Sequence, residues 1–167
     1  MALGNEIVLT PSRGVRVEGI ISGTPKPGTV MQIQAGTSPV TGRFTWEVYN
    51  RAADAYRPQG PIAILDMDAE QGKLATDAYV SGTRGFLFIP WPGCELNCLL
   101  KDITGTGTGD DASIGINLTV DDGTGKLIKT AGSTEAPATL QVEPFLALEA
   151  ETDVAADALI HVMFTGY

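Results

Sequence analysis

The chain has 167 residues, 43 % of them apolar, and a formal net charge of −9. This length allows one domain with a sizeable core, and the apolar content excludes a disordered chain. The negative charge disfavours a nucleic-acid partner, and no apolar run approaches the ~20 residues that a membrane helix needs, so we expect neither nucleic acid nor membrane as a partner.

The composition favours an all-β fold. Twenty glycines and ten prolines are spread along the chain, and no stretch keeps a helical period for long. We therefore predict a small barrel or sandwich of short antiparallel strands, with an extended N-terminal arm and at most short helices. The predicted boundaries are an arm at residues 1–14 and a single β-rich domain at residues 15–167. No secretion signal opens the chain, so we expect a soluble product made in the cytoplasm.

Short apolar runs separated by Gly- and Pro-containing turns predict the strands of the first half. Arg13 lies between the first two of them, and Arg16 lies within the second. They are either solvated surface or a basic patch that docks on an acidic partner. A polar stretch at 50–60 could hold one helical turn. The predicted strands are residues 7–9, 15–21, 29–34, 44–49 and 62–65.

The stretch 85–100, GFLFIPWPGCELNCLL, holds the densest group of large apolar side chains. Pro90 and Pro92 lack a backbone donor, so the step from Pro90 to Gly93 predicts a turn between two strands that form a hairpin. Cys94 and Cys98 share one face of the second strand, too far apart for a disulfide, and we expect buried, reduced thiols.

The C-terminal half repeats this alternation of strands and turns, without an internal sequence repeat. The segment 121–125, DDGTG, predicts a hairpin turn. Loops are expected at 103–113 and 131–138, and a helical turn is an alternative at 149–157. The predicted strands are residues 114–120, 126–130, 140–148 and 158–165.

No catalytic group of residues is apparent, so we expect no enzyme, no catalytic residue, no metal and no cofactor. His161 is the only histidine, and it alternates with apolar residues as a structural side chain does. Gly107–Ala112 matches a dinucleotide fingerprint only loosely and precedes a strand, not a helix. Aspartates at 66, 68, 110, 111, 121 and 122 lack the spacing of a calcium loop, and are solvated turn residues or, alternatively, a surface calcium site.

Three segments together resemble the head decoration (cement) proteins of tailed bacteriophages. They are GTPKPGTVMQIQAG at 23–36, GTRGFLFIPWPGCELNCLL at 82–100, and an ending that contains VDDGTGKLIKTAGS, FLALEA and ALIHVMFTGY. The resemblance implies a β-rich virion protein that trimerises on the capsid exterior and bridges neighbouring major capsid proteins. The implied partners are thus the major capsid protein and further copies of this chain.

With that role, we predict capsid contacts from the N-terminal arm and a subunit contact from the central turn. Ile7, Val8 and Leu9 would add a strand to an exposed sheet edge, with Arg13 and Arg16 as charge contacts. Trp91 would anchor neighbouring subunits, or else cover its own core. The alternatives to a cement protein are another virion β-domain, such as a tail or head fibre, and a carbohydrate- or ligand-binding β-sandwich module.

Overall fold

The computed structural model describes residues 6–35, 42–50, 61–68, 74–101, 112–121, 123–129, 144–151 and 158–166. These ranges form ten strands and contain no helix, which confirms the predicted all-β class. Accordingly, none of them holds a helix of the length and apolarity that crossing a membrane takes. Most residues of the possible helical turns at 50–60 and 149–157, and of the predicted loops at 103–113 and 131–138, lie outside the described residues.

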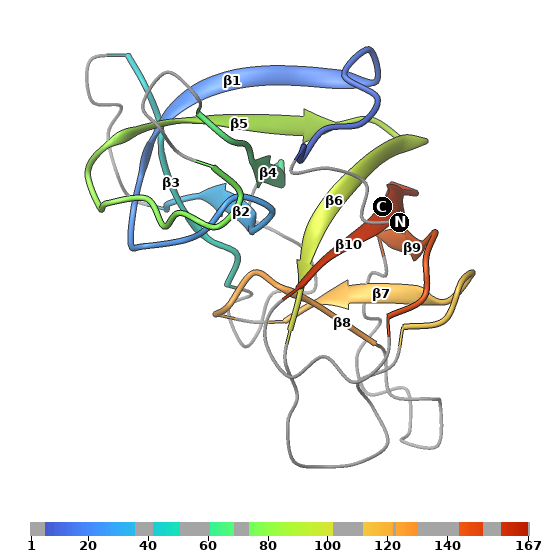
Figure 1. The fold of residues 1–167 in the computed structure, drawn as a ribbon. Coiled ribbons are helices and arrows are strands. Elements are labelled where there is room, and N and C mark those ends of the chain that lie inside the picture. Colours follow the sequence, from blue (N-terminus) through green and yellow to red (C-terminus); the bar gives the residue numbers. More distant parts are fainter. Residues whose placement is uncertain are drawn as a thin grey trace.

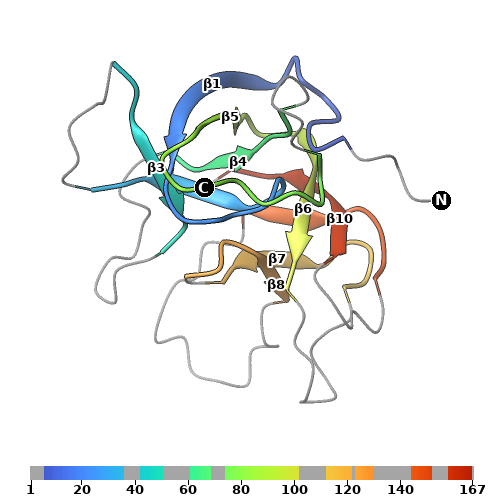
Figure 2. The ribbon, with the colours of Figure 1, turned by 60° about the vertical axis from the view of Figure 1, so that its left-hand side comes forward.

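The first five strands close into a barrel in the order β1-β3-β2-β4-β5. β1 pairs with β5 over seven residue pairs and is parallel to β3, while the other pairings are antiparallel. The strands occupy the upper part of the molecule in Figures 1 and 2. Their bounds are β1 Gly14–Ile21, β2 Val30–Ile33, β3 Thr45–Val48, β4 Ala63–Leu65 and β5 Arg84–Pro90.

The last five strands close into a second barrel in the order β10-β6-β8-β7-β9. Both barrels have the same topology: the first strand of each is parallel to the third and antiparallel to the fifth, and the second pairs with the third and the fourth. The strand pairing thus repeats although the sequence does not. The bounds are β6 Cys94–Leu100, β7 Asn117–Val120, β8 Leu127–Lys129, β9 Phe145–Ala147 and β10 Ala158–Phe164.

Alternating side chains explain why these segments are strands. In β10, Ile160, Val162 and Phe164 are almost fully buried, and the residues between them are only partly buried. The strand predicted at 158–165 is therefore confirmed. β7 and β8 pair antiparallel on either side of residues 121–125, which confirms the predicted hairpin.

Two apolar clusters fill the barrels, and the larger one also joins them. The smaller cluster, which includes Met31, Trp46 and Leu87, belongs to the first barrel. The larger cluster combines second-barrel residues such as Leu118 with first-barrel residues such as Ile64. Burial of a large apolar side chain stabilises the fold by roughly 1.5–3 kcal/mol, so the shared cluster ties the barrels together.

Backbone contacts at two glycines bring the barrels together closely. The Gly28 carbonyl accepts a hydrogen bond from the Leu99 amide at 3.0 Å, and the Gly125 carbonyl accepts one from the Val30 amide at 2.8 Å. A Cβ on Gly125 would lie 2.4 Å from the Val30 carbonyl oxygen, and one on Gly28 would lie 2.8 Å from a Leu159 methyl group. Only glycine fits at these positions without displacing a neighbour.

The predicted hairpin at 85–100 is wrong in its pairing. Both strands exist, but β5 pairs with β1 and β4, whereas β6 pairs with β10 and β8. The turn after Pro90 therefore passes the chain from one barrel to the other. Alternation identifies a strand and its buried face, but it carries no information about which strand lies beside it.

Two further expectations need correction. The strand predicted at 114–120 begins only at Asn117, and Ile114 is 69 % exposed in the preceding turn. Phe44, the first residue of the strand predicted at 44–49, precedes β3 and is 49 % exposed, while Trp46 within β3 is buried. The two cysteines are buried and free, which confirms their predicted state.

Candidate interaction surface

Residues 6–10, hereafter the N-terminal segment, lie along β6 of the same chain. Val8 forms an antiparallel bridge with Leu96. The Leu9 amide donates to the Glu95 carbonyl at 3.0 Å, and the Asn97 amide donates to the Ile7 carbonyl at 2.8 Å. Ile7 is 1 % exposed. The backbone groups predicted to add a strand to the capsid therefore already bind β6 in this structure.

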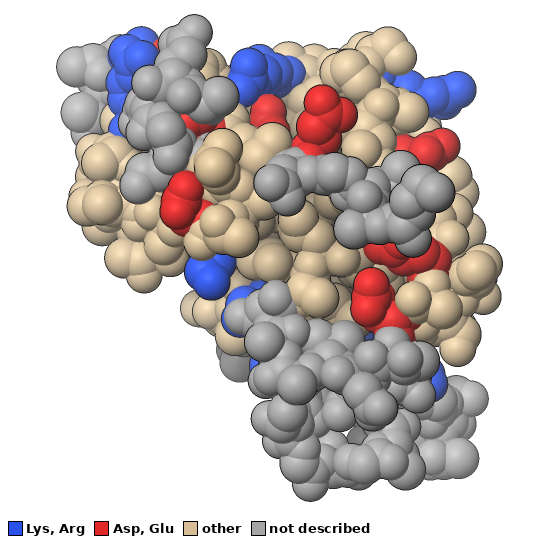
Figure 3. Space-filling view, viewed as in Figure 1, with Lys and Arg blue, Asp and Glu red and all other residues tan. Residues whose placement is uncertain are grey.

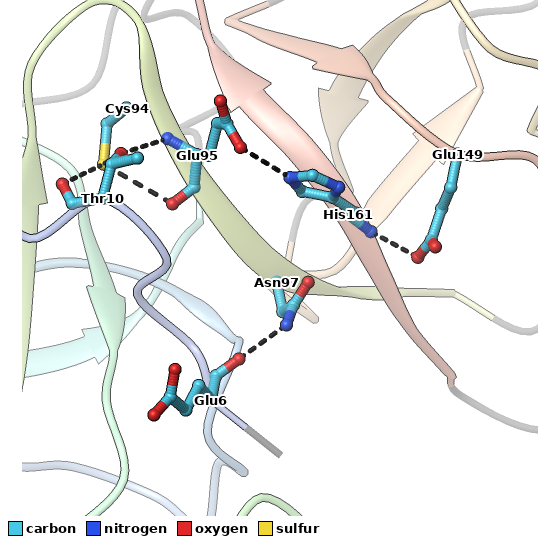
Figure 4. A network of polar contacts seen from close by, with 7 residues as sticks. All are labelled: Glu6, Thr10, Cys94, Glu95, Asn97, Glu149 and His161. Atoms are coloured by element: carbon cyan, nitrogen blue, oxygen red, sulfur yellow. Dashed lines mark hydrogen bonds and ion pairs between the residues drawn. The ribbon is translucent and has the colours of Figure 1, made fainter. Parts of the chain in front are cut away.

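Side chains reinforce the attachment of the N-terminal segment (Figure 4). The buried Asn97 amide group donates to the Glu6 carbonyl at 2.6 Å. The Thr10 hydroxyl accepts a hydrogen bond from the Glu95 amide at 2.8 Å and lies 3.5 Å from the Cys94 sulfur. Burial raises the pKa of the Cys94 thiol, and that of the fully buried Cys98 thiol more strongly, so both remain protonated at neutral pH.

His161 joins β10 to β6 on the other side of the same network. Its Nε2 lies 3.2 Å from Glu95 Oε2, and its backbone amide donates to Glu149 Oε1 at 2.6 Å. These contacts hold two paired strands and the segment after β9 together, as Figure 4 shows. Within the described ranges, no group of three or more His, Cys, Asp or Glu side chains could hold a metal ion.

The structure brings Arg13 and Trp91 together at the corner where β5 ends and β6 begins. The Trp91 amide donates to the Arg13 carbonyl at 2.8 Å. A Cβ on Gly93 would lie 3.0 Å from the Arg13 guanidinium, so that side chain extends over the turn. Trp91 is 54 % exposed, so about half of its surface faces solvent at the turn.

Arg16, predicted as a second charge contact, is occupied within the chain. Its Nε lies 3.2 Å from Asp66 Oδ2, its Nη2 donates to the Met67 carbonyl at 3.3 Å, and its guanidinium lies 4.0 Å from the centre of the Phe86 ring. Burial raises the pKa of Asp66, although the Met67 amide and Arg16 act in the opposite direction. Any contact of Arg16 with a partner must compete with these interactions.

A groove of about 380 Å³ separates the N-terminal segment from the first barrel. Ile7 and Val8 line one side, and Met67 and Phe88 line the other, with the Arg16–Asp66 pair at its edge. Arg16 and Asp66 already pair with each other, so this pair does not by itself indicate a ligand in the groove.

Charge is divided unequally between the two halves of the chain, a signal that was present in the sequence. Residues 1–92 contain eight Lys or Arg and eight Asp or Glu, whereas residues 93–167 contain three and twelve, so the whole net charge of −9 belongs to the second half. All six arginines lie in the first half. On the face shown in Figure 3, basic side chains lie along the upper edge, over β1.

Comparisons with known proteins identify a fold and no family. Neither a protein-family model nor a curated protein matches the sequence. Among solved structures, the chain is similar to the N base of the head fibre gp8.5 of bacteriophage phi29, with a TM-score of 0.50 and 12 % identity over 91 % of this chain and 94 % of that one. The likeness thus spans nearly all of both chains, and this protein has the fold of that head-fibre base.

Proposed function

We propose that this chain is a non-enzymatic structural protein of a bacteriophage virion that binds the outside of the assembled capsid. The observation that carries the proposal is the fold shared with a phage head-fibre base over 91 % of this chain. The three segments that resemble phage decoration proteins support the same class of protein. In this role the protein acts as a homotrimer whose partner is the major capsid protein.

Two forms of this role are compatible with the fold. As a cement protein, the chain bridges neighbouring major capsid proteins and stabilises the shell, because a ligand that binds only the assembled shell favours it by mass action. This form is supported by the sequence resemblance. As the base of a head fibre, the chain attaches a projecting element without bridging subunits, which is supported by the structural neighbour.

The first half of the chain is the better candidate for the shell-facing side. It is neutral overall and holds all the arginines, whereas the second half carries the net charge of −9. Ile7, Val8, Leu9, Arg13 and Arg16 remain the proposed capsid contacts. Strand addition by Ile7–Leu9 would first require that the N-terminal segment leave β6, with loss of the hydrogen bonds to Glu95 and Asn97.

The test uses purified protein and expanded, undecorated heads of the phage that encodes it. We expect saturable co-sedimentation with the heads and no co-sedimentation with unassembled capsid protein. The complete absence of head binding would contradict the proposal.

The thermal stability of the same heads separates the two forms. A cement protein should raise the temperature at which the heads rupture, in step with occupancy. A fibre base should bind to saturation and leave that temperature unchanged. Arg16→Gln tests the contact residues, because it keeps a polar side chain and removes the charge; unchanged affinity would exclude Arg16 from the capsid contact.

A further inference from the structure

We infer that the edge of β1 at Arg16 and Glu18, hereafter the open edge, takes up an extended, acidic segment of the major capsid protein as an added strand. The shell then donates a strand to this chain, which is the reverse of the direction predicted for the N-terminal segment. The identity of the donor rests on the proposed function, whereas the open edge itself does not.

Backbone hydrogen bonds leave β1 on alternate sides, as in any paired strand. The odd-numbered residues bond to β5: the Ile21 amide donates to the Thr83 carbonyl at 2.9 Å, and the register continues this contact to every second residue of the strand. The even-numbered residues face the opposite edge, where the Ile20 amide donates to the Phe44 carbonyl at 3.0 Å, just before β3.

Pairing with β3 covers only the last part of that opposite edge. The register partners of β3 in β1 are Ile20 and Ile21. Arg16 and Glu18 lie earlier in the strand and face the same edge, and among the described residues none forms a hydrogen bond with the amide or carbonyl of either. In Figures 1 and 2, β1 lies at the upper margin of the molecule, with β5 below it.

The second barrel shows what covers such an edge. β6 is the counterpart of β1, and its pairing with β8, the third strand of its barrel, is equally short. The N-terminal segment covers the earlier part of that edge, where Val8 forms an antiparallel bridge with Leu96. The Glu95 carbonyl and the Asn97 amide also hydrogen-bond to this segment. An extended strand that comes from outside the barrel is therefore the occupant that fits this position.

The correspondence between the two edges extends to single residues. The last bond toward the third strand comes from the Ser22 amide in the first barrel and from the Lys101 amide in the second. The two residues of the open edge precede Ser22 by the same spacings as Glu95 and Asn97 precede Lys101. Within the described part of the chain, these positions are therefore covered in the second barrel and open in the first.

Charged side chains at a strand edge can deter pairing, but those of the open edge are held by neighbouring elements. The Arg16 guanidinium turns across β5 and lies 4.0 Å from the centre of the Phe86 ring. Glu18 Oε1 lies 2.8 Å from Arg84 Nε on β5. Glu18 Oε2 accepts a hydrogen bond from Arg43 Nε at 2.7 Å, at the end where β3 begins. These contacts leave the backbone between the two side chains accessible.

The side chains beside the open edge set the chemistry of the added strand. On one face of β1, Val15 is 46 % exposed and Val17 is partly buried, so alternate residues of the added strand should be apolar. On the other face, the Arg16 and Arg84 side chains are 52 % and 55 % exposed. Figure 3 shows basic side chains along this margin, so the remaining residues of the added strand should be acidic.

Amide hydrogen exchange, resolved to single residues by mass spectrometry, tests the open edge. The protein is measured alone and at saturation on expanded, undecorated heads. We expect the Arg16 and Glu18 amides to exchange rapidly in the free protein and at least tenfold more slowly on heads. The Val17 and Gly19 amides, which face β5, are internal controls and should be slow in both states.

Arg16→Pro and Arg16→Gln form a matched pair, because both remove the guanidinium and only proline removes the amide. Proline is tolerated in an edge strand where the amide faces solvent, and circular dichroism establishes that the variant is folded. We expect Arg16→Pro to bind heads at least tenfold more weakly than Arg16→Gln. Equal affinities of the two folded variants would overturn the inference. If the proline variant does not fold, amide exchange of the wild type decides.

Overlapping synthetic peptides that span the major capsid protein identify the donated segment. We expect one stretch of alternating acidic and apolar residues to bind and to protect the amides of the open edge. The same peptide with Asn and Gln in place of its acidic residues should bind at least tenfold more weakly.

The outcomes separate this inference from the proposed function. Head binding without protection of the two amides would overturn the inference and leave the proposed function standing. No head binding, with a capsid-protein peptide that still protects these amides, would contradict the proposed function and leave the inference standing. Neither head binding nor a protecting peptide would overturn both. Exchange that slows with protein concentration in the absence of heads would place a second copy at the open edge and also overturn the inference.

Discussion

Tyr79 shows how burial controls a single polar side chain in the first barrel. The residue is 1 % exposed, and its hydroxyl donates to the Asp66 carbonyl at 3.0 Å. Burial, with smaller contributions from Asp68 and Asp66, raises its pKa from 10.0 to about 12. The folded protein therefore keeps this proton over a pH range in which the unfolded chain has lost it.

We expect this difference to make the protein less stable at high pH. Because the pKa of Tyr79 is raised in the folded state, the contribution of its protonated form to the free energy of unfolding is complete below pH 10. That contribution is lost as pH rises toward 12, by up to about 2–3 kcal/mol. Tyr79→Phe should cost about 1 kcal/mol at pH 8 through the lost hydrogen bond, but should reduce the decline above pH 10. Urea unfolding at pH 8, 10 and 11 measures both effects. If the free energy of unfolding fell equally steeply with pH in the wild type and in Tyr79→Phe, the assignment of this pH dependence to Tyr79 would be contradicted.

At the scale of elements, the N-terminal segment completes β6. One edge of β6 pairs with β10, and its other edge meets three separate pieces of chain: the N-terminal segment, Gly28 and β8. The segment is therefore part of the second barrel's closure, even though it precedes the first barrel in sequence. Any function that requires a free arm must first open this closure.

Ile7→Ala tests whether the N-terminal segment is bound in solution. If Ile7 is buried as described, the substitution should cost about 2–5 kcal/mol through lost apolar contacts and an unfilled cavity. Ile114→Ala is the matched control, because that isoleucine is 69 % exposed and its loss should change stability by less than about 0.5 kcal/mol. Chemical denaturation measures both. If Ile7→Ala lowered the free energy of unfolding as little as Ile114→Ala, the N-terminal segment would be detached from β6 in solution.

At the scale of the whole molecule, two barrels of one topology behave as one body because they share a cluster and approach closely at glycines. Gly125 and Gly123 both have positive φ, at 62° and 80°. Around Gly123 a Cβ would meet nothing within 4 Å, whereas at Gly125 it would meet the Val30 carbonyl of the other barrel at 2.4 Å. Substitutions at Gly123 and Gly125 therefore separate the cost of backbone strain from the cost of losing close contact between the barrels.

Alanine at each of these two positions should reveal the contribution of that close approach. Gly123→Ala should cost about 1–2 kcal/mol from the positive φ alone. Gly125→Ala should cost about 1–3 kcal/mol more, because the barrels must move apart or repack. Thermal and urea unfolding of the two variants give the comparison. Equal losses of unfolding free energy in the two variants would show that the barrels can move apart at Gly125 without a measurable cost.

The sequence by itself determined the elements whose evidence is local. Alternation in 158–165 gave the buried face of β10, the Asp- and Gly-rich segment gave the β7–β8 turn, and prolines around Trp91 gave an exposed turn. It also carried the unequal charge of the two halves, which becomes informative only once those halves are known to be barrels.

Only the tertiary structure decided which strands are neighbours. It separated β5 from β6, placed the N-terminal segment on β6, and brought Arg13 beside Trp91 across 78 positions of sequence. The physical reason is that side-chain alternation is set by each strand's own geometry, whereas pairing depends on contacts between distant segments. Those contacts form only when the complete set of strands can close and bury its apolar faces together.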